Sequence, residues 1–332
     1  MNGKVPIVWV LADERAGNRS QGFGVAEALG FPFVTKEIRY GRFGEWPNVL
    51  LGASFFGLTD ASRRDLTPPW PDIAIGAGRR VAPVARRIKR LAESRTFIVQ
   101  IMNPGWFDVR EIDLVAVPHH DRAKPGGNIL AVTGAPHQVR AETLGSAADD
   151  WRGRLAHLPK PWIAVLVGGS AKGRALDGAL IADLAGRLDA FAGRCGGSLL
   201  VTSSRRTEPA AMDALLARLT APNHAHRWDK GGENPYLGFL ALADAVVVTG
   251  DSMSMCSEAC ASGAPVYIFA RDEFVTPKYA RFHRELYDLG LARPLSDAAS
   301  AGRGGQARLN AADAIAAEIR IRLGLTAAGK PS

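Results

Sequence analysis

Residues 162–170 read WIAVLVGGS, an apolar run that ends in two glycines and a serine. An apolar segment of this length, closed by small turn residues, is typical of a strand that is buried on both faces of a parallel sheet. A helical pattern follows at residues 176–191. The sequence therefore predicts that a strand–turn–helix unit begins at Trp162.

The same alternation of short apolar runs and longer helical patterns extends in both directions from this unit. Toward the N-terminus we predict strands at residues 5–11, 33–38, 72–75, 96–101, 112–117 and 128–132, with helices at 21–29 and 81–93. Toward the C-terminus we predict strands at 198–202, 245–248 and 266–269, with helices at 208–219, 237–242, 253–261, 278–289 and 311–323. Two such arrays predict an α/β protein of two Rossmann-like domains that face one another across a cleft, with ligands bound beyond the carboxyl ends of the strands.

The domain boundaries follow from these arrays. An N-terminal Rossmann-like domain is expected at residues 1–150, a C-terminal one at 160–300, and a final helix, packing back on the first domain, at 306–325. Residues 145–161 have few strand signals and end in Pro-Lys-Pro, so we expect a linker there. The Ala- and Gly-rich run at 298–305 predicts a mobile loop.

The composition is that of an ordinary globular protein. The chain has 332 residues, of which 47% are hydrophobic and 22% charged, and this excludes disordered, collagen-like and coiled-coil proteins. A net charge of +8 favours an anionic partner. Three cysteines without a CxxC pair argue against a disulfide scaffold or a zinc site.

The apolar stretch at 5–12 is too short for a signal peptide, so we expect a cytoplasmic protein, with a peripheral position on the inner face of the cytoplasmic membrane as an option.

The first candidate site is the turn Gly168-Gly169-Ser170 at the end of the strand that opens the second array. Consecutive glycines allow a tight turn and a close approach of the backbone to a ligand, and Ser170 adds a hydroxyl, so the turn suits a phosphate. It is not a Walker loop, because Lys and Ser/Thr are missing at the required places. The alternative is an ordinary strand–helix turn.

The second candidate site, TGDSMSMCSEA at residues 249–259, follows another apolar strand and opens a helix. Ser252 and Ser254 are N-cap candidates, and free N–H groups at a helix start attract anions. Glu258 lies farther along the helix, where a carboxylate can accept the two vicinal hydroxyls of a ribose. We therefore predict nucleotide binding by Asp251, Ser252, Ser254, Met255 and Glu258. The alternative is a Ser-capped helix with a solvated Glu258.

The third candidate site follows a further strand of the second domain. Its hydroxyls and guanidinium groups suit a diphosphate, and a capped turn with solvated arginines is almost as good an explanation. The predicted nucleotide-sugar-binding residues of this site are Thr202, Ser203, Ser204 and Arg205.

The first domain offers polar residues after its own strands. Asp13 follows the first strand, and Gly17 is expected in a flexible turn that lets Asn18 and Gln21 face the cleft. Gly78 and Arg79 belong to a second glycine turn. These residues are predicted to lie on the acceptor side of the cleft, with Asp13 as a candidate catalytic base.

The segment Pro118-His119-His120-Asp121 follows another strand of the first domain, and His119 with Asp121 is the other candidate catalytic base. A structural His–Asp cluster is the commoner explanation.

Neither glycine turn of the first domain completes a dinucleotide fingerprint, since Val81 and Glu27 stand at the third glycine positions. NAD is therefore not expected, and a nucleotide-sugar epimerase is disfavoured further because no Tyr-x-x-x-Lys pair is present.

Seven basic residues between 79 and 95 indicate a helix that rests on anionic lipid, or simply one with its Arg side in water. No nucleic-acid recognition motif accompanies the charge, so nucleic acid is not an expected partner.

Taken in order, these motifs resemble a known family. The set is Gly17-Asn18-x-x-Gln21, Gly76-Ala77-Gly78-Arg79-Arg80, Pro118-His119-x-Asp121, Gly134-Ala135-Pro136, Gly168-Gly169-Ser170 and Asp251-Ser252-x-Ser254-Met255-x-x-Glu258. It resembles the Elm-type "mitochondrial fission" domain family over about residues 5 to 320. That family is similar to GT-B glycosyltransferases, particularly the peptidoglycan N-acetylglucosaminyltransferase.

The resemblance implies roles for individual residues. The turn Gly168-Gly169-Ser170 would approach the diphosphate. The helix start would cap the phosphates with Ser252, Ser254 and Met255. Glu258 would hold the ribose. The acceptor loop of the peptidoglycan enzyme is replaced here by residues 13–21, so its acceptor and base do not carry over.

The sequence thus predicts a metal-independent GT-B glycosyltransferase that uses a nucleotide-sugar as co-substrate, needs no cofactor, and acts on an envelope lipid or glycan. Arg205 and helix N-termini would stabilise the leaving diphosphate, and no DxD motif is present to hold a metal. The alternative is a non-catalytic scaffold of the same fold that binds a membrane or a protein partner, as a fission factor would.

Overall fold

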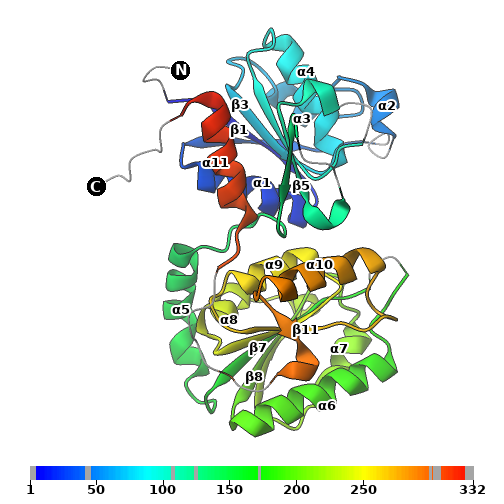
Figure 1. The fold of residues 1–332 in the computed structure, drawn as a ribbon, viewed down its shortest axis with the longest axis vertical. Helices are drawn as coiled ribbons and strands as arrows, with labels where there is room; N and C mark the ends of the chain where they lie inside the picture. Colours follow the sequence, from blue (N-terminus) through cyan, green and yellow to red (C-terminus); the bar gives the residue numbers. More distant parts are fainter. Residues whose placement is uncertain are drawn as a thin grey trace. The chain divides into compact units, whose positions relative to one another are not determined.

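The computed structural model describes residues 5–41, 46–105, 109–122, 126–170, 173–298, 301 and 308–325. The chain divides into two compact units, unit 1 with Met1–Gln138 and Asn310–Ser332, and unit 2 with Val139–Leu309. Each unit has one parallel sheet with helices on both faces (Figure 1). The α/β fold with two Rossmann-like units that the sequence predicted is confirmed.

The sheet of unit 1 has the strand order β2-β1-β3-β4-β5-β6, and every neighbouring pair is parallel. Its strands are β1 (Val8–Asp13), β2 (Phe33–Ile38), β3 (Ile73–Ala77), β4 (Phe97–Ile101), β5 (Leu114–Pro118) and β6 (Ile129–Val132). Its helices are α1 (Ala16–Leu29), α2 (Asn48–Leu51), α3 (Asp60–Asp65), α4 (Ala82–Leu91) and α11 (Ala311–Leu323), with 3₁₀ segments η1 (Arg79–Val81), η2 (Val109–Glu111) and η3 (His119–Asp121).

Alternate residues of β1 pack on opposite faces of this sheet, as strand geometry requires. Val8 and Val10 belong to the core beneath α1 and α11. Trp9 and Leu11 belong to the core beneath α4. Because both faces are covered, the strand is apolar throughout, which is the pattern that the sequence showed.

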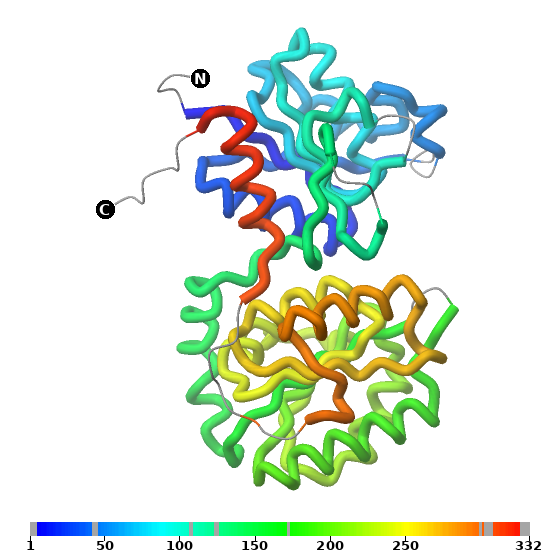
Figure 2. Tube along the Cα trace, viewed as in Figure 1, coloured from blue at the N-terminus to red at the C-terminus, as the bar shows by residue number. Residues whose placement is uncertain are grey.

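The C-terminal helix α11 packs against α1, the first helix of the chain (Figure 2). Arg320 Nη2 donates hydrogen bonds to the carbonyl oxygens of Ala28 and Leu29 at 2.8 and 2.9 Å. Positive charge at the end of α1 is favourable, because the last carbonyl groups of a helix carry partial negative charge. The prediction that the final helix packs back on the first domain is confirmed.

The sheet of unit 2 has the order β12-β11-β10-β7-β8-β9, again parallel throughout. Its strands are β7 (Trp162–Val167), β8 (Ser198–Ser203), β9 (Asn223–His226), β10 (Ala245–Thr249), β11 (Val266–Phe269) and β12 (Arg293–Pro294). Its helices are α5 (Ala141–Leu155), α6 (Gly178–Cys195), α7 (Pro209–Leu216), α8 (Tyr236–Leu242), α9 (Met253–Cys260) and α10 (Pro277–Asp288), with 3₁₀ segments η4 (Trp228–Lys230) and η5 (Leu295–Asp297).

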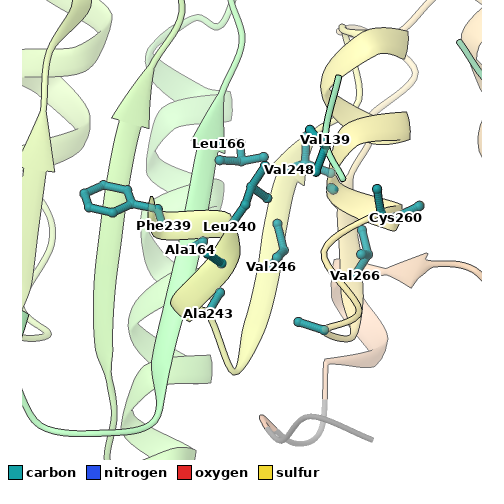
Figure 3. Packing of buried hydrophobic residues seen from close by; sticks show 14 of the residues in the cluster. Val139, Ala164, Leu166, Phe239, Leu240, Ala243, Val246, Val248, Cys260 and Val266 are labelled. Carbon is teal, nitrogen blue, oxygen red and sulfur yellow. The ribbon is translucent and has the colours of Figure 1, made fainter. Parts of the chain in front are cut away.

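The two faces of this sheet bury separate cores. Leu166, Val246 and Val248 point to the face that also holds Phe239 of α8, and Figure 3 shows these side chains together. Val165 and its alternate neighbours point to the face that α6 and α7 cover. The two cores hold the carboxyl ends of β7, β8 and β10 in fixed register.

The predicted linker at 145–161 is wrong, because most of it belongs to the helix α5. Leu144, Trp151 and Leu155 are its buried residues, and the ring of Trp151 lies 5.9 Å from that of Phe239. This packing against α8 places the helix in unit 2, so the division of the chain falls after Gln138 and not at 150.

Some sequence predictions lie outside the described residues. They concern most of the predicted loop at 298–305 and the first residues, 306 and 307, of the predicted final helix, and residues 171 and 172 after the Gly-Gly-Ser turn are not described either. In the part of the chain that the structure describes, no helix has both the length and the apolar character needed to cross a membrane.

Candidate functional site

The carboxyl ends of three adjacent strands meet at one edge of the unit 2 sheet. In the order β10-β7-β8, Leu166 pairs with Val248 and Val167 pairs with Ser203. Each of the three candidate sites of the second domain follows one of these strands. The structure therefore brings together the Gly-Gly-Ser turn after β7, the Ser/Arg loop after β8 and the start of α9 after β10.

The buried carboxylate of Asp251 joins all three segments. Its Oδ2 accepts hydrogen bonds from the Gly169 N–H at 2.9 Å and from Arg206 Nη2 at 3.0 Å. Its Oδ1 accepts from the Thr249 hydroxyl at 2.7 Å, and that hydroxyl oxygen accepts from the Gly168 N–H at 2.7 Å. Asp251 was predicted to contact the nucleotide, but these bonds direct its carboxylate into the protein, where it fixes the turns.

The two glycines of the turn are required by close packing inside the protein. A Cβ atom at Gly168 would collide with the carboxylate of Asp251, and one at Gly169 would collide with the backbone of Arg206 and Thr207. The sequence analysis explained these glycines by the approach of a ligand. The structure supplies a second reason, because the loops after β7 and β8 touch here.

The loop after β8 is bonded to the same turn. The Ser204 N–H donates to Thr207 Oγ1 at 2.9 Å, and the Thr207 hydroxyl donates to the carbonyl oxygen of Val167 at 3.0 Å. The Ser170 N–H donates to the carbonyl oxygen of Arg206 at 3.3 Å. These bonds hold the loop in a defined shape beside Ser170.

The two arginines of this loop have different environments. Arg206 is bound to Asp251. Arg205, the predicted diphosphate ligand, is exposed and has no bonding partner among the described residues. Thr202 is buried within β8, so its side chain lies beneath the edge of the sheet. Arg205 thus remains accessible to an anion.

Helix α9 begins at the N-cap residue Ser252, whose Oγ accepts a 3.4 Å hydrogen bond from the Met255 N–H. Ser254 and Met255 lie half-buried in its first turn. The capping role predicted for Ser252 is confirmed by this bond. The remaining N–H groups of the first turn point from the helix start, where the helix dipole favours negative charge.

Glu258 lies one turn farther along α9 and accepts a hydrogen bond from the Tyr236 hydroxyl of α8. Burial raises the pKa of Glu258 to about 7, although the Tyr236 hydrogen bond opposes this shift. Burial and the neighbouring Glu258 raise the pKa of Tyr236 well above its usual value. Sequence reasoning missed Tyr236, because nothing near it in the sequence connects it with a residue 22 positions away.

Sequence reasoning also missed Trp228, which follows β9 at the same edge of the sheet. Its backbone N–H donates to Ser203 Oγ at 2.9 Å, and the side chain is 50% exposed. A half-exposed indole is a surface on which a flat ring can stack. The alternation of strands and helices could have located it, had β9 been predicted.

Unit 1 has a polar cluster at the carboxyl end of β1. Asp13 Oδ2 accepts from Asn18 Nδ2 at 2.8 Å, and Asp13 Oδ1 lies 3.7 Å from Arg80 Nη1. Both Asp13 and Arg80 are buried. Gly78 has a φ of 81° and lies so close to Asn18 that a Cβ atom would collide with it. Asp13, Asn18 and Gly78 thus lie together in an internal ion-paired cluster at the carboxyl end of β1.

Three other residues predicted for the acceptor side have different positions. Gly17 lies in the first turn of α1, which begins before the predicted residue 21, so the expected flexible turn is wrong. Gln21 is buried on the same helix. Arg79 Nη1 donates to the carbonyl oxygen of Trp46 at 3.1 Å and so contacts the segment that contains α2.

The His–Asp cluster after β5 is arranged differently from the expectation. The histidine that lies against Asp121 is His120, with Nε2 3.5 Å from Asp121 Oδ1, and His120 is buried. His119 is exposed, and its Nδ1 lies 3.3 Å from Thr133 Oγ1. The accessible histidine of the pair is therefore His119.

The basic helix α4 does not present a free cationic face. Arg86 and Arg90 bind Glu111, and Lys89 binds Asp113 at 2.6 Å. The two guanidinium groups lower the pKa of Glu111 to about 2. Because these three cations are paired within the protein, the suggestion that this helix rests on anionic lipid is weakened.

No group of three or more His, Cys, Asp or Glu side chains is arranged to hold a metal ion in the described part of the chain.

Comparison with known proteins identifies the family. The family model described as "Mitochondrial fission ELM1" matches residues 16–323. The chain belongs to this family. Within the ELM1 family, the mitochondrial fission protein ELM1 of Arabidopsis thaliana is 31% identical over 266 residues, which are 74% of this chain and 62% of that protein. The match thus spans less than two thirds of the plant relative. The uncharacterized protein RP120 of Rickettsia prowazekii is 27% identical over 324 residues, covering 86% of this chain and 89% of that protein.

Solved structures share the fold of this ELM1-family chain. The UDP-GlcNAc 2-epimerase of Methanocaldococcus jannaschii has a TM-score of 0.59 at 11% identity, covering 96% of this chain and 99% of that chain. The enzyme of Neisseria meningitidis bound to UDP-GlcNAc has a TM-score of 0.53 at 11% identity, with the same coverage. At this identity the likeness concerns the fold alone, and it agrees with the GT-B-like architecture that the sequence predicted.

Proposed function

We propose that unit 2 binds a nucleotide-sugar and that the chain is a metal-independent glycosyltransferase of GT-B type. The observation that carries this proposal is the convergence of the turns after β7, β8 and β10, tied by Asp251. The edge that they form offers the N–H groups of the first turn of α9, serine hydroxyls and the exposed Arg205. A pyrophosphate needs donors of this kind, aimed at one place.

The reaction follows from the charges at this edge. The acceptor oxygen forms a bond to the anomeric carbon of the sugar, and the bond between that carbon and the diphosphate oxygen breaks. Its electron pair stays on the diphosphate, where the N–H groups of the first turn of α9 and Arg205 stabilise the added charge. The acceptor proton passes to a base.

The ribose and the base of the nucleotide would each find a contact in this site. Glu258 Oε2 is bonded to Tyr236, which leaves Oε1 to accept a ribose hydroxyl. Trp228, at the end of the neighbouring strand β9, offers its ring to the base. This assignment keeps the predicted role of Glu258 and adds Tyr236 as the residue that orients its carboxylate.

Unit 1 is proposed to bind the acceptor, an envelope lipid or glycan, and to supply the base. Asp13 is buried and paired with Arg80. His119 is exposed beside Thr133. Since a base must reach the acceptor hydroxyl, His119 is the better placed of the two predicted bases. Gly17, Asn18, Gln21, Gly78 and Arg79 would then shape the acceptor unit and not take part in proton transfer.

A panel of nucleotides tests the donor site. UDP, GDP, ADP and CMP at millimolar concentration should include one that raises the melting temperature, because a ligand at 100 times its Kd stabilises the native state by about 2.7 kcal/mol. The corresponding nucleotide-sugar should then be consumed when an acceptor extract is added. A flat panel would contradict the proposal.

Two other functions are supported by particular observations. The Arabidopsis relative is named a mitochondrial fission protein, and the second candidate is therefore a non-catalytic scaffold that binds a membrane or protein partner, in the cytoplasm or at the inner membrane face. The fold is also that of UDP-GlcNAc 2-epimerases, so it is compatible with an epimerase as the third candidate, and the sequence argument against one concerned enzymes with a dinucleotide fingerprint. A scaffold binds no nucleotide, and an epimerase converts its nucleotide-sugar without an acceptor, so the same assays separate all three.

A further inference from the structure

Unit 1 presents an apolar patch around its shortest helix, α2. The patch consists of Trp46, Val49, Leu50 and Phe56, which are 44%, 59%, 68% and 49% exposed. Soluble proteins expose single apolar side chains commonly, but four within eleven residues mark an interaction surface. Figure 1 shows α2 at the periphery of unit 1, on the side of the sheet that α4 covers.

The patch is held in shape by bonds to the body of unit 1. Asn48 Nδ2 donates to the carbonyl oxygens of Arg79 and Pro104 at 2.8 and 2.9 Å. Leu51 is buried beneath the helix, and the rings of Trp46 and Phe56 lie 5.9 Å apart. The segment that carries the exposed side chains is therefore fixed to unit 1. Their exposure is a feature of the folded unit.

Cationic side chains lie directly beside the patch. Arg79 Nη1 is 3.1 Å from the carbonyl oxygen of Trp46, and Arg63 Nη2 is 3.5 Å from that of Phe55. Arg64 is exposed on the same helix as Arg63, and Asp60 is the acidic residue in the first turn of that helix. Two aromatic rings, a valine and a leucine are thus bordered by the guanidinium groups of Arg79 and Arg63, with Arg64 exposed on the adjacent helix.

We propose that this patch docks the chain on an anionic lipid bilayer. Trp and Phe side chains are suited to the interface between headgroups and acyl chains, and arginine stems cover apolar surface while their charged ends reach lipid phosphates. Val49 and Leu50, the most exposed members, enter the acyl region. The cations at its edge select a bilayer over an apolar protein surface, which would leave them without counter-charges. The inference rests on the proposed role of unit 1 in binding an envelope lipid or glycan and needs no transfer reaction.

The experiment is co-sedimentation of the full chain with vesicles. Vesicles of phosphatidylglycerol and phosphatidylcholine should bind the wild-type chain, and vesicles of phosphatidylcholine alone should bind it more weakly. Leu50→Asp should lower the partition coefficient for the mixed vesicles by at least about tenfold, because a charged side chain replaces an inserted apolar one. Arg63→Gln with Arg64→Gln should remove most of the preference for anionic vesicles.

Ile321→Asp is the matched control. Ile321 is 74% exposed on α11, which covers the opposite face of the same sheet, so this substitution should leave vesicle binding unchanged. Equal loss in both variants, or no loss in Leu50→Asp, would overturn the proposal. So would a wild-type dimer that Leu50→Asp dissociates while vesicle binding is absent. Leu50→Asp and Ile321→Asp should both keep any stabilisation by nucleotide. Failure of the membrane proposal is therefore distinguishable from failure of the proposed donor site.

Discussion

The backbone N–H of Gly169 lies 2.9 Å from the buried carboxylate of Asp251, which connects the turn after β7 with the loop after β10. Two residues 82 positions apart thereby fix the edge of the sheet on which the proposed donor site depends. The same carboxylate binds Arg206 at 3.0 Å. A single side chain therefore sets the positions of three loops.

Asp251→Ala should destabilise unit 2 by about 3 kcal/mol, because it leaves Arg206, the Thr249 hydroxyl and the Gly169 N–H without their partner. Asp251→Asn keeps the shape and one acceptor oxygen, so its effect should be smaller. Chemical denaturation monitored by tryptophan fluorescence measures both. Equal stability of Asp251→Ala and the wild type would show that the bonds to Asp251 do not hold the edge together.

Gly169→Ala should destabilise the chain by about 2 kcal/mol, since a Cβ atom would collide with the backbone of Arg206 and force the two loops apart. Gly186→Ala is the matched control, because Gly186 lies on α6 with open space around it. Alanine there should be neutral or stabilising. Thermal unfolding of both variants measures the difference, and equal melting temperatures would refute the close packing of the turn.

Glu258 should make stability depend on pH in a defined direction. Its folded-state pKa is raised to about 7, above the unfolded value, so the folded chain holds the extra proton between about pH 4.5 and about pH 7. The free energy of unfolding should therefore fall as pH rises through this window. Denaturation curves of the wild type and of Glu258→Gln measure the contribution, which the substitution should remove. A wild-type curve identical to that of Glu258→Gln would contradict the raised pKa.

Trp228→Ala should weaken nucleotide binding by about tenfold, because stacking of a base on an aromatic ring contributes about 1–3 kcal/mol. Trp46→Ala, an equally exposed tryptophan of unit 1, is the control and should leave nucleotide affinity unchanged. Isothermal titration with the nucleotide selected by the panel measures both affinities. Unchanged affinity in Trp228→Ala would remove the base from this position.

The fold could be predicted from the sequence because its strands are apolar on both faces and its helices follow at regular intervals. WIAVLV at 162–167 shows this pattern at its clearest. The apolar pattern did not predict the elements that bury few apolar residues. The helix α5 buries Leu144, Trp151 and Leu155 among many small and charged residues, and its spacing of seven and four would have revealed it. The strand β9 was missed because three of its four residues, NHAH, are polar.

The candidate site was predictable in its location and less so in its roles. Strand ends pointed to the three loops that the structure brings together, because parallel strands align their carboxyl ends. The internal bonds could not be anticipated, since the partners of Asp251 and Glu258 lie far away in the sequence. Adjacent arginines look alike in sequence, yet Arg206 binds Asp251 and Arg205 faces solvent.

The most direct test of the account is the affinity of one nucleoside diphosphate for the wild-type chain and for Ser170→Ala and Arg205→Gln, measured by isothermal titration. The account predicts binding at one site, weakened about tenfold by each substitution, since each removes a hydrogen-bond donor to the pyrophosphate. No binding at millimolar nucleotide, or binding that neither substitution affects, would contradict it.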